Sequence, residues 1–294
     1  RQYAGSRPVR CTGAARSPNL RMNIVCIGAH PDDCECFAGG TAVLWARQGH
    51  RVIFVSMTNG DAGHFAMGGG ALAQRRAREA RLSAERGGVE ELILGYHDGE
   101  LEATLDARRE VVRILRRYEA DIVLSHRPND YHPDHRYTAT LVQDAAFMVT
   151  VPNFCPEAPR LARNPVFMYL SDHFTKPAPF KPDIAVDVTD VMDVKFDMLD
   201  VMESQVYEWL PWLDGQLDQV PAGKKERRAW LAKAWKPFFK KHTQLAAPAL
   251  KKWYGPAQAK RIQFAEGFEI CEYGHIPSKT ELAKLFPFFK KKLP

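Results

Sequence analysis

The sequence predicts an α/β protein with a doubly wound, Rossmann-like sheet. We expect mostly parallel strands, helices on both faces of the sheet, and a C-terminal appendage that is helical or irregular. Two observations predict this class. Short apolar segments alternate with helical patterns from residue 22 to residue 149, as repeated βαβ units require. Polar clusters follow two of these apolar segments, at the strand ends where such sheets place their ligands.

The strands are expected where apolar runs are short and bounded by turn residues. They cover residues 23–29, 51–57, 91–94 and 121–125, and then, after a Pro-rich stretch, 166–170 and 183–188. The first two are apolar nearly throughout, which is typical of parallel strands buried on both faces.

The helices are expected between these strands. They cover residues 37–48, 71–86, 105–118, 135–149 and 191–205. Residues 71–86 are rich in Ala, Arg and Glu, which favour helix, and the pair Gly87-Gly88 ends the pattern.

The length of 294 residues suits one large domain or a domain with an appendage. Hydrophobic residues make up 45% and charged residues 26%, as in ordinary globular proteins. No apolar run approaches the roughly 18 residues of a membrane span, so none is expected. The six cysteines form no C-x-x-C pair and no secretory signal is apparent, so we expect a cytoplasmic protein with reduced thiols.

The net charge of +6 is unevenly distributed, which suggests three regions. Residues 1–21 hold five arginines and no acid, and we expect a disordered or non-native extension, with an organelle transit peptide as the alternative. Residues 22–206 form the α/β domain. Residues 207–294 form a Trp- and Lys-rich extension that packs on this domain and returns to it near 261–275.

The basic extension allows two interpretations. Residues 209–262 contain twelve Lys or Arg and five of the six tryptophans, and five prolines are expected to divide them into short pieces. These prolines are Pro211, Pro221, Pro237, Pro248 and Pro256. We favour a lid or a contact between copies of the chain, with lysines facing water. The alternative is a surface that binds nucleic acid or another polyanion.

The two polar clusters have the composition of a zinc site. His30 lies three positions before Asp33, and His132 lies three positions before His135. Residues three apart share a face in the first turn of a helix, so Asp32 would point away from an ion held by its neighbours. Two histidines and one aspartate leave a position for water, as catalytic zinc requires. Spacing alone leaves open which histidine of the second pair is the ligand.

Each cluster also has a structural explanation. Asp32, Asp33 and Glu35 are suited to stabilise a helix N-terminus, and the second cluster suits a polar loop. The pair Cys34 and Cys36 is expected to be buried and inert, and His126 to be either a supporting residue or part of the core.

Five segments resemble the zinc-dependent N-deacetylases related to N-acetylglucosaminyl-phosphatidylinositol de-N-acetylase, the LmbE-like or PIG-L family. They are Ala-His-Pro-Asp-Asp-Cys-Glu at 29–35, Thr-Asn-Gly-Asp-Ala-Gly at 58–63, Arg-Ala-Arg-Glu-Ala at 76–80, His-Pro-Asp-His at 132–135, and Phe-Ala-Glu-Gly-Phe-Glu at 264–269. The resemblance runs from residue 22 to about 206 and resumes near 261. Its first and fourth segments are the most specific.

The resemblance implies a role for each residue of the clusters. It makes residues 22–206 the catalytic domain, with one Zn²⁺ per chain, or Fe²⁺ as a substitute. The implied zinc ligands are His30, Asp33 and His135. Asp32 becomes the general base. His132 becomes the residue that stabilises the oxyanion and protonates the departing amine, with Asp134 holding it in position.

The resemblance also implies a substrate. Arg76 matches a substrate-binding arginine, although arginines on such a helix often face water, and Asp98 resembles a contact to a sugar hydroxyl. The expected reaction is removal of an N-acetyl group from an N-acetylglucosamine-type sugar or its conjugate, without nucleic acid as a partner. The alternatives are hydrolysis of another amide, such as a thiol conjugate or natural-product intermediate, a polyanion-binding protein with a structural metal, and a phosphoesterase.

Overall fold

The computed structural model describes residues 21–289, and within them the strands form one seven-stranded sheet of order β3-β2-β1-β4-β5-β7-β6. The strands are β1 (Asn23–Gly28), β2 (Arg51–Thr58), β3 (Glu90–Tyr96), β4 (Ile122–Ser125), β5 (Val166–Leu170), β6 (Ile184–Asp187) and β7 (Ala265–Gly274). Neighbours among β1–β5 pair in parallel, and β7 is antiparallel to both β5 and β6. The predicted mostly parallel sheet is confirmed.

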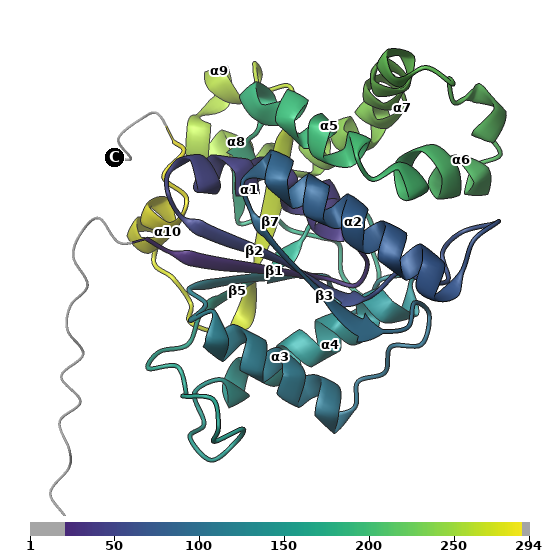
Figure 1. Ribbon diagram of the computed structural model, residues 1–294. Coiled ribbons are helices and arrows are strands. Elements are labelled where there is room, and N and C mark those ends of the chain that lie inside the picture. Colours follow the sequence, from purple (N-terminus) through teal and green to yellow (C-terminus); the bar gives the residue numbers. More distant parts are fainter. Residues whose placement is uncertain (1–20, 290–294) are drawn as a thin grey trace, which may run out of the picture.

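Helices cover both faces of this sheet (Figure 1). One face carries α1 (Asp33–Arg47), α2 (Gly69–Gly87) and α5 (Met192–Asp200), and the other carries α3 (Leu105–Arg117) and α4 (Pro133–Met148). The strand residues alternate accordingly. Ile24 and Cys26 of β1 pack in the core beneath α1, whereas Val25 and Ile27 pack in the core beneath α3 and α4. Both faces of β1 are therefore buried, as its apolar sequence predicts.

The remaining elements follow β6. They are η1 (Thr189–Val191), the π-helix η2 (Ser204–Trp209), α6 (Leu210–Leu213), η3 (Leu217–Gln219), α7 (Lys224–Leu245), α8 (Ala247–Tyr254), α9 (Pro256–Ala259) and α10 (Lys279–Leu285). The single helix predicted over residues 191–205 is wrong, because α5 ends at Asp200 and a π-helix follows. The predicted domain boundary at residue 206 falls inside η2 and stays a prediction.

One of the five prolines, Pro237, does not divide residues 209–262 as expected. Helix α7 runs for 22 residues through Pro237. A proline inside a helix removes one backbone hydrogen bond, and apolar contacts on both sides of it compensate for that loss. Leu231 and Phe239 are buried in the core while Lys233 and Lys236 are exposed. The other helix-associated prolines, Pro211, Pro248 and Pro256, lie in the first turns of α6, α8 and α9, where proline is tolerated.

Both polar clusters lie at helix N-termini after neighbouring strands. Strand β1 pairs directly with β4, and α1 and α4 follow them. Each helix starts earlier than predicted, at Asp33 and Pro133, so that the last residue of the first cluster and the last three of the second lie in the first turns. The fold thus brings segments a hundred residues apart to one edge of the sheet.

Two further predictions concern the N-terminal extension and the relation of the chain to a membrane. The predicted N-terminal extension lies outside the described residues, apart from Arg21. Among the described helices, none combines the length and the hydropathy needed to cross a membrane. The cytoplasmic location stays a prediction.

Candidate metal and catalytic site

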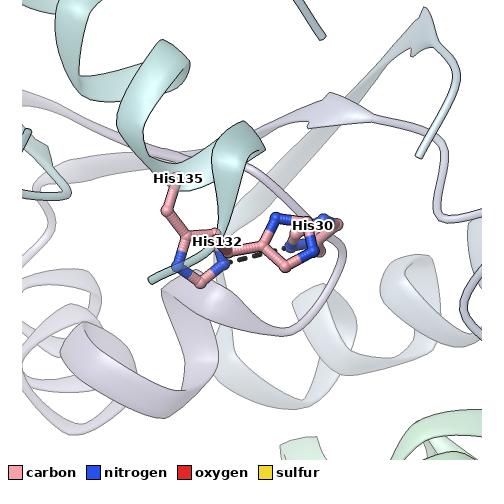
Figure 2. Close-up of side chains that lie close together, drawn as sticks. All are labelled: His30, His132 and His135. Carbon is pink, nitrogen blue, oxygen red and sulfur yellow. Dashed lines mark hydrogen bonds between the residues drawn. The ribbon is translucent and has the colours of Figure 1, made fainter. Parts of the chain in front are cut away.

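His30 and His135 meet at the edge formed by β1 and β4. Figure 2 shows His30, from the loop after β1, converging with His132 and His135, from the start of α4. The Nδ1 of His30 lies 3.2 Å from the Nε2 of His135. Both side chains are buried. The two rings are therefore close enough to share one ion.

Asp33 presents one carboxylate oxygen to the same point. Its Oδ2 accepts hydrogen bonds from the backbone amides of Ala29 and His30, at 2.9 and 2.8 Å. The same oxygen lies 3.1 Å from Nε2 of His126. Its Oδ1 lies 3.4 Å from Nε2 of His135. Oδ2 is thus held by the chain, which leaves Oδ1 available as a ligand.

The three predicted ligands lie at separations close to those around a tetrahedral zinc ion. Bonds of 2.0–2.2 Å to nitrogen and oxygen place neighbouring ligand atoms about 3.3–3.6 Å apart. The two histidine nitrogens lie 3.2 Å apart, and Nε2 of His135 lies 3.4 Å from Oδ1 of Asp33, whereas the 3.6 Å from Nδ1 of His30 is to the other oxygen, Oδ2. Among the described residues, three groups have donor atoms that all lie within 4.8 Å of one another: His30, His132 and His135; Asp33, His126 and His135; and His30, Asp98 and Asp134.

Electrostatics also favour a cation at this point. Burial alone would lower the pKa of His30, but hydrogen bonding with Asp134, Asp33 and Asp98 outweighs it and raises the pKa well above its usual value. Nε2 of His30 lies 3.2 Å from Asp98 and 3.3 Å from Asp134. A buried group of carboxylates needs positive charge nearby, which a divalent ion supplies.

Side chains next to the predicted ligands hold these ligands in orientation. Oδ1 of Asp130 lies 3.0 Å from Nδ1 of His135, the arrangement in which a carboxylate fixes the tautomer of a metal-binding histidine. His126 stacks on His135 with ring centroids 4.1 Å apart and planes at 4°. His126 is therefore a supporting residue rather than only a core residue. No pattern in the sequence singles out Asp130, which belongs to neither of the two histidine-containing pairs.

Asp32 is held beside the ligands without serving as a helix cap. It lies at the N-cap position of α1, but its side chain makes no capping hydrogen bond. Its carboxylate instead accepts a hydrogen bond from Nε2 of Gln205 at 2.7 Å. Its backbone adopts φ 151° and ψ −24°, a strained conformation of the kind found at active sites. Burial, and then the charge of Asp33, raise the pKa of Asp32 to about 7.

His132 and Asp134 begin α4. Nδ1 of His132 accepts a hydrogen bond from the backbone amide of Asp134 and so caps the helix. Burial, followed by the charges of His30 and His135, lowers the pKa of His132. The Asp134 carboxylate accepts hydrogen bonds from the amides of Gly99 and Leu101. Its support of the His132 ring stays a prediction.

Arg76 does not face water. It is 1% exposed, and its guanidinium donates to the carbonyl of Gly63 and to Oε1 of Gln205. It also lies 3.7 Å from Oδ2 of Asp98. Gly60 passes so close that an added Cβ would lie 2.5 Å from Nη1 of Arg76, which requires glycine there. The loop after β2 thus forms a cradle for this arginine.

A cavity of about 600 Å³ opens over these residues. Its inner wall holds His30, Asp32, Asp33, Arg76, Asp98, His132 and His135. Its outer wall comes from residues after 207, including Trp209 of η2 and Trp230, Trp235 and Phe238 of α7. The role of this region as a lid stays a prediction. Contacts between copies of the chain stay a prediction.

The two cysteines beside the proposed ligands are inert, and another histidine, His64, pairs elsewhere. Burial raises the pKa of the Cys34 and Cys36 thiols well above its usual value, as expected of inert thiols. Nε2 of His64 lies 2.8 Å from Glu208, which binds Arg75 as well. His64 therefore belongs to an ion-pair network between α2 and η2.

Comparison with known proteins places the chain in a family. The family model described as PIG-L, GlcNAc-PI de-N-acetylase, matches residues 25–146. Diacetylchitobiose deacetylase of Thermococcus kodakarensis is 34% identical over 205 residues, which cover 65% of this chain and 74% of that protein. The chain belongs to the PIG-L family.

Two further relatives support the fold and differ in the activity that their names state. N,N′-diacetylchitobiose deacetylase from Pyrococcus horikoshii, solved with an inhibitor, superimposes with a TM-score of 0.65 at 27% identity, covering 88% of each chain. A 4-oxalmesaconate hydratase of Pseudomonas putida is 27% identical over 207 residues, which cover 68% of this chain and 80% of that protein. The relatives of this chain therefore include deacetylases and a hydratase.

Proposed function

We propose that this PIG-L protein is a zinc-dependent hydrolase that removes an N-acetyl group from an N-acetylglucosamine-type sugar or its conjugate. The observation that carries the proposal is the convergence of His30, Asp33 and His135 at 3.2–3.6 Å, with Asp32 beside them. These three residues would hold one zinc ion per chain, with iron(II) as a substitute. Such an ion supplies Lewis acidity, which polarises an amide carbonyl and makes water more acidic.

Asp32 is positioned to accept a proton. Its carboxylate lines the cavity next to Asp33, and because Asp32 is not one of the proposed ligands, it is free to act as a general base. Gln205 occupies one side of the carboxylate and holds its orientation. Asp32 would take the proton from the attacking water.

His132 would stabilise the negative charge on the carbonyl oxygen. Because Nδ1 accepts the hydrogen bond of the helix cap, the neutral ring carries its hydrogen on Nε2. That hydrogen is the donor available to an oxyanion. We also propose that His132 protonates the departing amine. For this step the imidazole ring must take up a proton while negative charge develops on the carbonyl oxygen beside it.

The charges of the cavity favour a neutral sugar over a polycarboxylate. Arg76 is the one Lys or Arg among the described lining residues. The lining also contains six aspartates: Asp32, Asp33, Asp98, Asp130, Asp172 and Asp214. A substrate with several carboxylate groups would be repelled by these aspartates. Sugar hydroxyls can instead donate to Asp98, the contact that we propose for it, while Arg76 binds an acceptor oxygen.

Acetate release tests this function. Purified protein loaded with Zn²⁺ should release acetate from N-acetylglucosamine conjugates, and Asp32→Asn should release far less. No release from any N-acetyl sugar, with turnover of another amide, would favour the alternative amidase. Tight, salt-sensitive nucleic-acid binding that survives His135→Ala would instead favour the polyanion-binding protein.

A further inference from the structure

A buried ion pair lies behind the inner wall of the cavity. Nζ of Lys195, on α5, lies 2.6 Å from Oε1 of Glu266, on β7. The two residues are 1% and 4% exposed. Both line a small pocket that shares Cys36, Phe37 and His242 with the cavity. The pair therefore adjoins the proposed site, although neither of its residues lines the cavity itself.

Both ends of the pair bond the backbone of α1. Nζ of Lys195 donates to the carbonyl of Cys36 at 2.7 Å. The Glu266 carboxylate accepts from the amides of Gly40 and Thr41, at 2.9 and 2.7 Å, and from the Thr41 hydroxyl at 2.6 Å. In a regular α-helix, the carbonyl of Cys36 is the acceptor for the amide of Gly40. The ion pair thus contacts both groups of one position in the helical hydrogen-bond ladder.

The close approach of Glu266 to α1 requires glycine at position 40. A Cβ added there would lie 2.7 Å from Cβ of Val188 and 3.2 Å from Oε1 of Glu266. A larger residue would therefore push α1 away from both. Glycine inside a helix is about 1 kcal/mol less favourable than alanine. Gly40 thus places contact with Glu266 above the local preference for helix.

The ion pair connects the two elements that hold Asp32. Helices α1 and α5 and strand β7 adjoin one another (Figure 1). Asp32 and Asp33 begin α1, and the carbonyl of Cys36 follows about one turn later. Gln205, which donates to Asp32, lies in η2, ten positions after Lys195 of α5. A contact that fixes α1 against α5 therefore helps to fix Asp32 against Gln205.

Net stability is a poor reason for such a pair. Transfer of two charges out of water costs several kcal/mol per ion, and well-packed apolar residues of similar volume often stabilise a fold equally well or better. Apolar side chains do not supply directed hydrogen bonds. Lys195 and Glu266 supply charge-assisted bonds to three backbone groups of α1. These bonds restrict both the rotation of the helix and its position along its own axis.

We propose that the Lys195–Glu266 pair is a positioning device that fixes the first turns of α1 and, through them, the proposed ligand Asp33. In the same way it keeps Asp32 within reach of Gln205. This inference rests on the function proposed above and adds two positioning residues to the site. Neither residue contacts the metal position, so the effect passes through the backbone of α1.

Glu266→Asp separates charge from position. The shorter side chain keeps a negative charge for Lys195 but does not reach Lys195 and both amides of α1 together. The Kd for Zn²⁺ should rise about tenfold, as for other residues that orient metal ligands. Competition with a chromogenic chelator measures this Kd. The visible absorption spectrum of the Co²⁺-loaded chain should also change, because it depends on ligand geometry. A wild-type Kd and spectrum would show that charge alone suffices and would overturn the inference.

A double variant tests the pair without leaving a lone buried charge. Lys195→Met combined with Glu266→Gln keeps the side-chain volumes, and replacing both partners avoids the large loss of stability that follows from removing one. Its Kd for Zn²⁺ should rise at least as much as that of Glu266→Asp. A Kd equal to that of the wild type would contradict the positioning role.

Arg116→Lys is the matched control. Arg116 is a buried cation, 3% exposed, and its guanidinium bonds the carbonyls of Met148 and Val149 at the C-terminal end of α4, away from the cavity. The control should lower the free energy of unfolding and leave the Kd for Zn²⁺ unchanged. An equal rise of this Kd in the control would mean that the effect follows from lost stability, and the inference would be wrong.

The zinc measurements do not need turnover, so they separate this inference from the proposed function. If zinc binding responds as expected and no N-acetyl sugar is hydrolysed, the proposed substrate is wrong and the positioning role stands. If sugars are hydrolysed, the kcat of Glu266→Asp should fall about tenfold. Unchanged kcat and unchanged zinc binding would overturn the positioning role and leave the proposed function standing.

Discussion

Gln205 donates a hydrogen bond from Nε2 to the carboxylate of Asp32 at 2.7 Å, while its Oε1 accepts from Arg76. One amide thus fixes both the proposed base and the proposed substrate-binding arginine. Gln205 lies in the π-helix η2, a rare element that is often found at functional sites. The C-terminal part of the chain therefore contributes to the site directly, through a contact across 173 positions.

Gln205→Ala should lower kcat by about 10- to 100-fold, because residues that orient a site contribute this much. Zinc content should be unchanged, since Gln205 contacts none of the proposed ligands. Steady-state kinetics and metal analysis measure both quantities. Gln219→Ala is the control, because Gln219 is exposed in η3. Equal kcat values for the two variants would show that the orientation set by Gln205 does not affect the rate-limiting step.

Asp32→Asn should retain zinc and lose turnover by about 10²- to 10⁴-fold, the usual contribution of a general base. The amide keeps the size of the carboxylate but does not accept a proton readily. Activity near that of the wild type would contradict the role of Asp32.

Asp130→Asn should weaken zinc binding by about 10- to 100-fold, because Asp130 orients the His135 ring at 3.0 Å. Competition with a chromogenic chelator measures the affinity. Asp106→Asn is the control, since the Asp106 side chain is 90% exposed on α3. Identical zinc affinities in the two variants would show that Asp130 does not support zinc binding.

His242 should make the fold sensitive to acid. Burial, and then the charges of Lys195, His173 and Lys241, lower its pKa to about 3. The unfolded chain binds a proton at His242 below pH 6.5 and the folded chain does not, so stability is lost as pH falls from 6.5 towards 3. Below pH 6.5 the loss is about 1.4 kcal/mol per pH unit.

Denaturant unfolding of the wild type and His242→Gln at pH 7.5 and 5.5 tests this expectation. The free energy of unfolding of the wild type, relative to the variant, should fall by about 1–1.5 kcal/mol between these pH values. A difference that stays constant would mean that His242 titrates alike in the folded and unfolded chains.

The sequence predicts those parts of the fold that depend on local pattern. The apolar runs place every strand from β1 to β6 to within two residues, and strands buried on both faces, such as β1, require continuous apolar sequence. The pair spacing at His30 and His132 marks the metal position, although His30 lies before α1 and His132 caps α4. The resemblance was needed to choose between His132 and His135.

Other features depend on contacts that no local pattern records. Gln205 and Asp130 act through partners that only the tertiary structure brings near, so neither stands out in the sequence. Helix α7 passes through Pro237 because its apolar face packs on the core, which overrides the local preference to end the helix. The aromatic wall is visible as composition in the sequence, but its position over the site is not.

The most direct test of the account is the zinc content of the purified chain, measured by atomic emission after loading and dialysis. His30, Asp33 and His135 should together hold one zinc ion per chain, and His135→Ala should hold almost none. His64→Ala is the control, because His64 pairs with Glu208 away from the proposed ligands. Equal zinc in wild type and His135→Ala would contradict the shared-ion site on which the proposed chemistry depends.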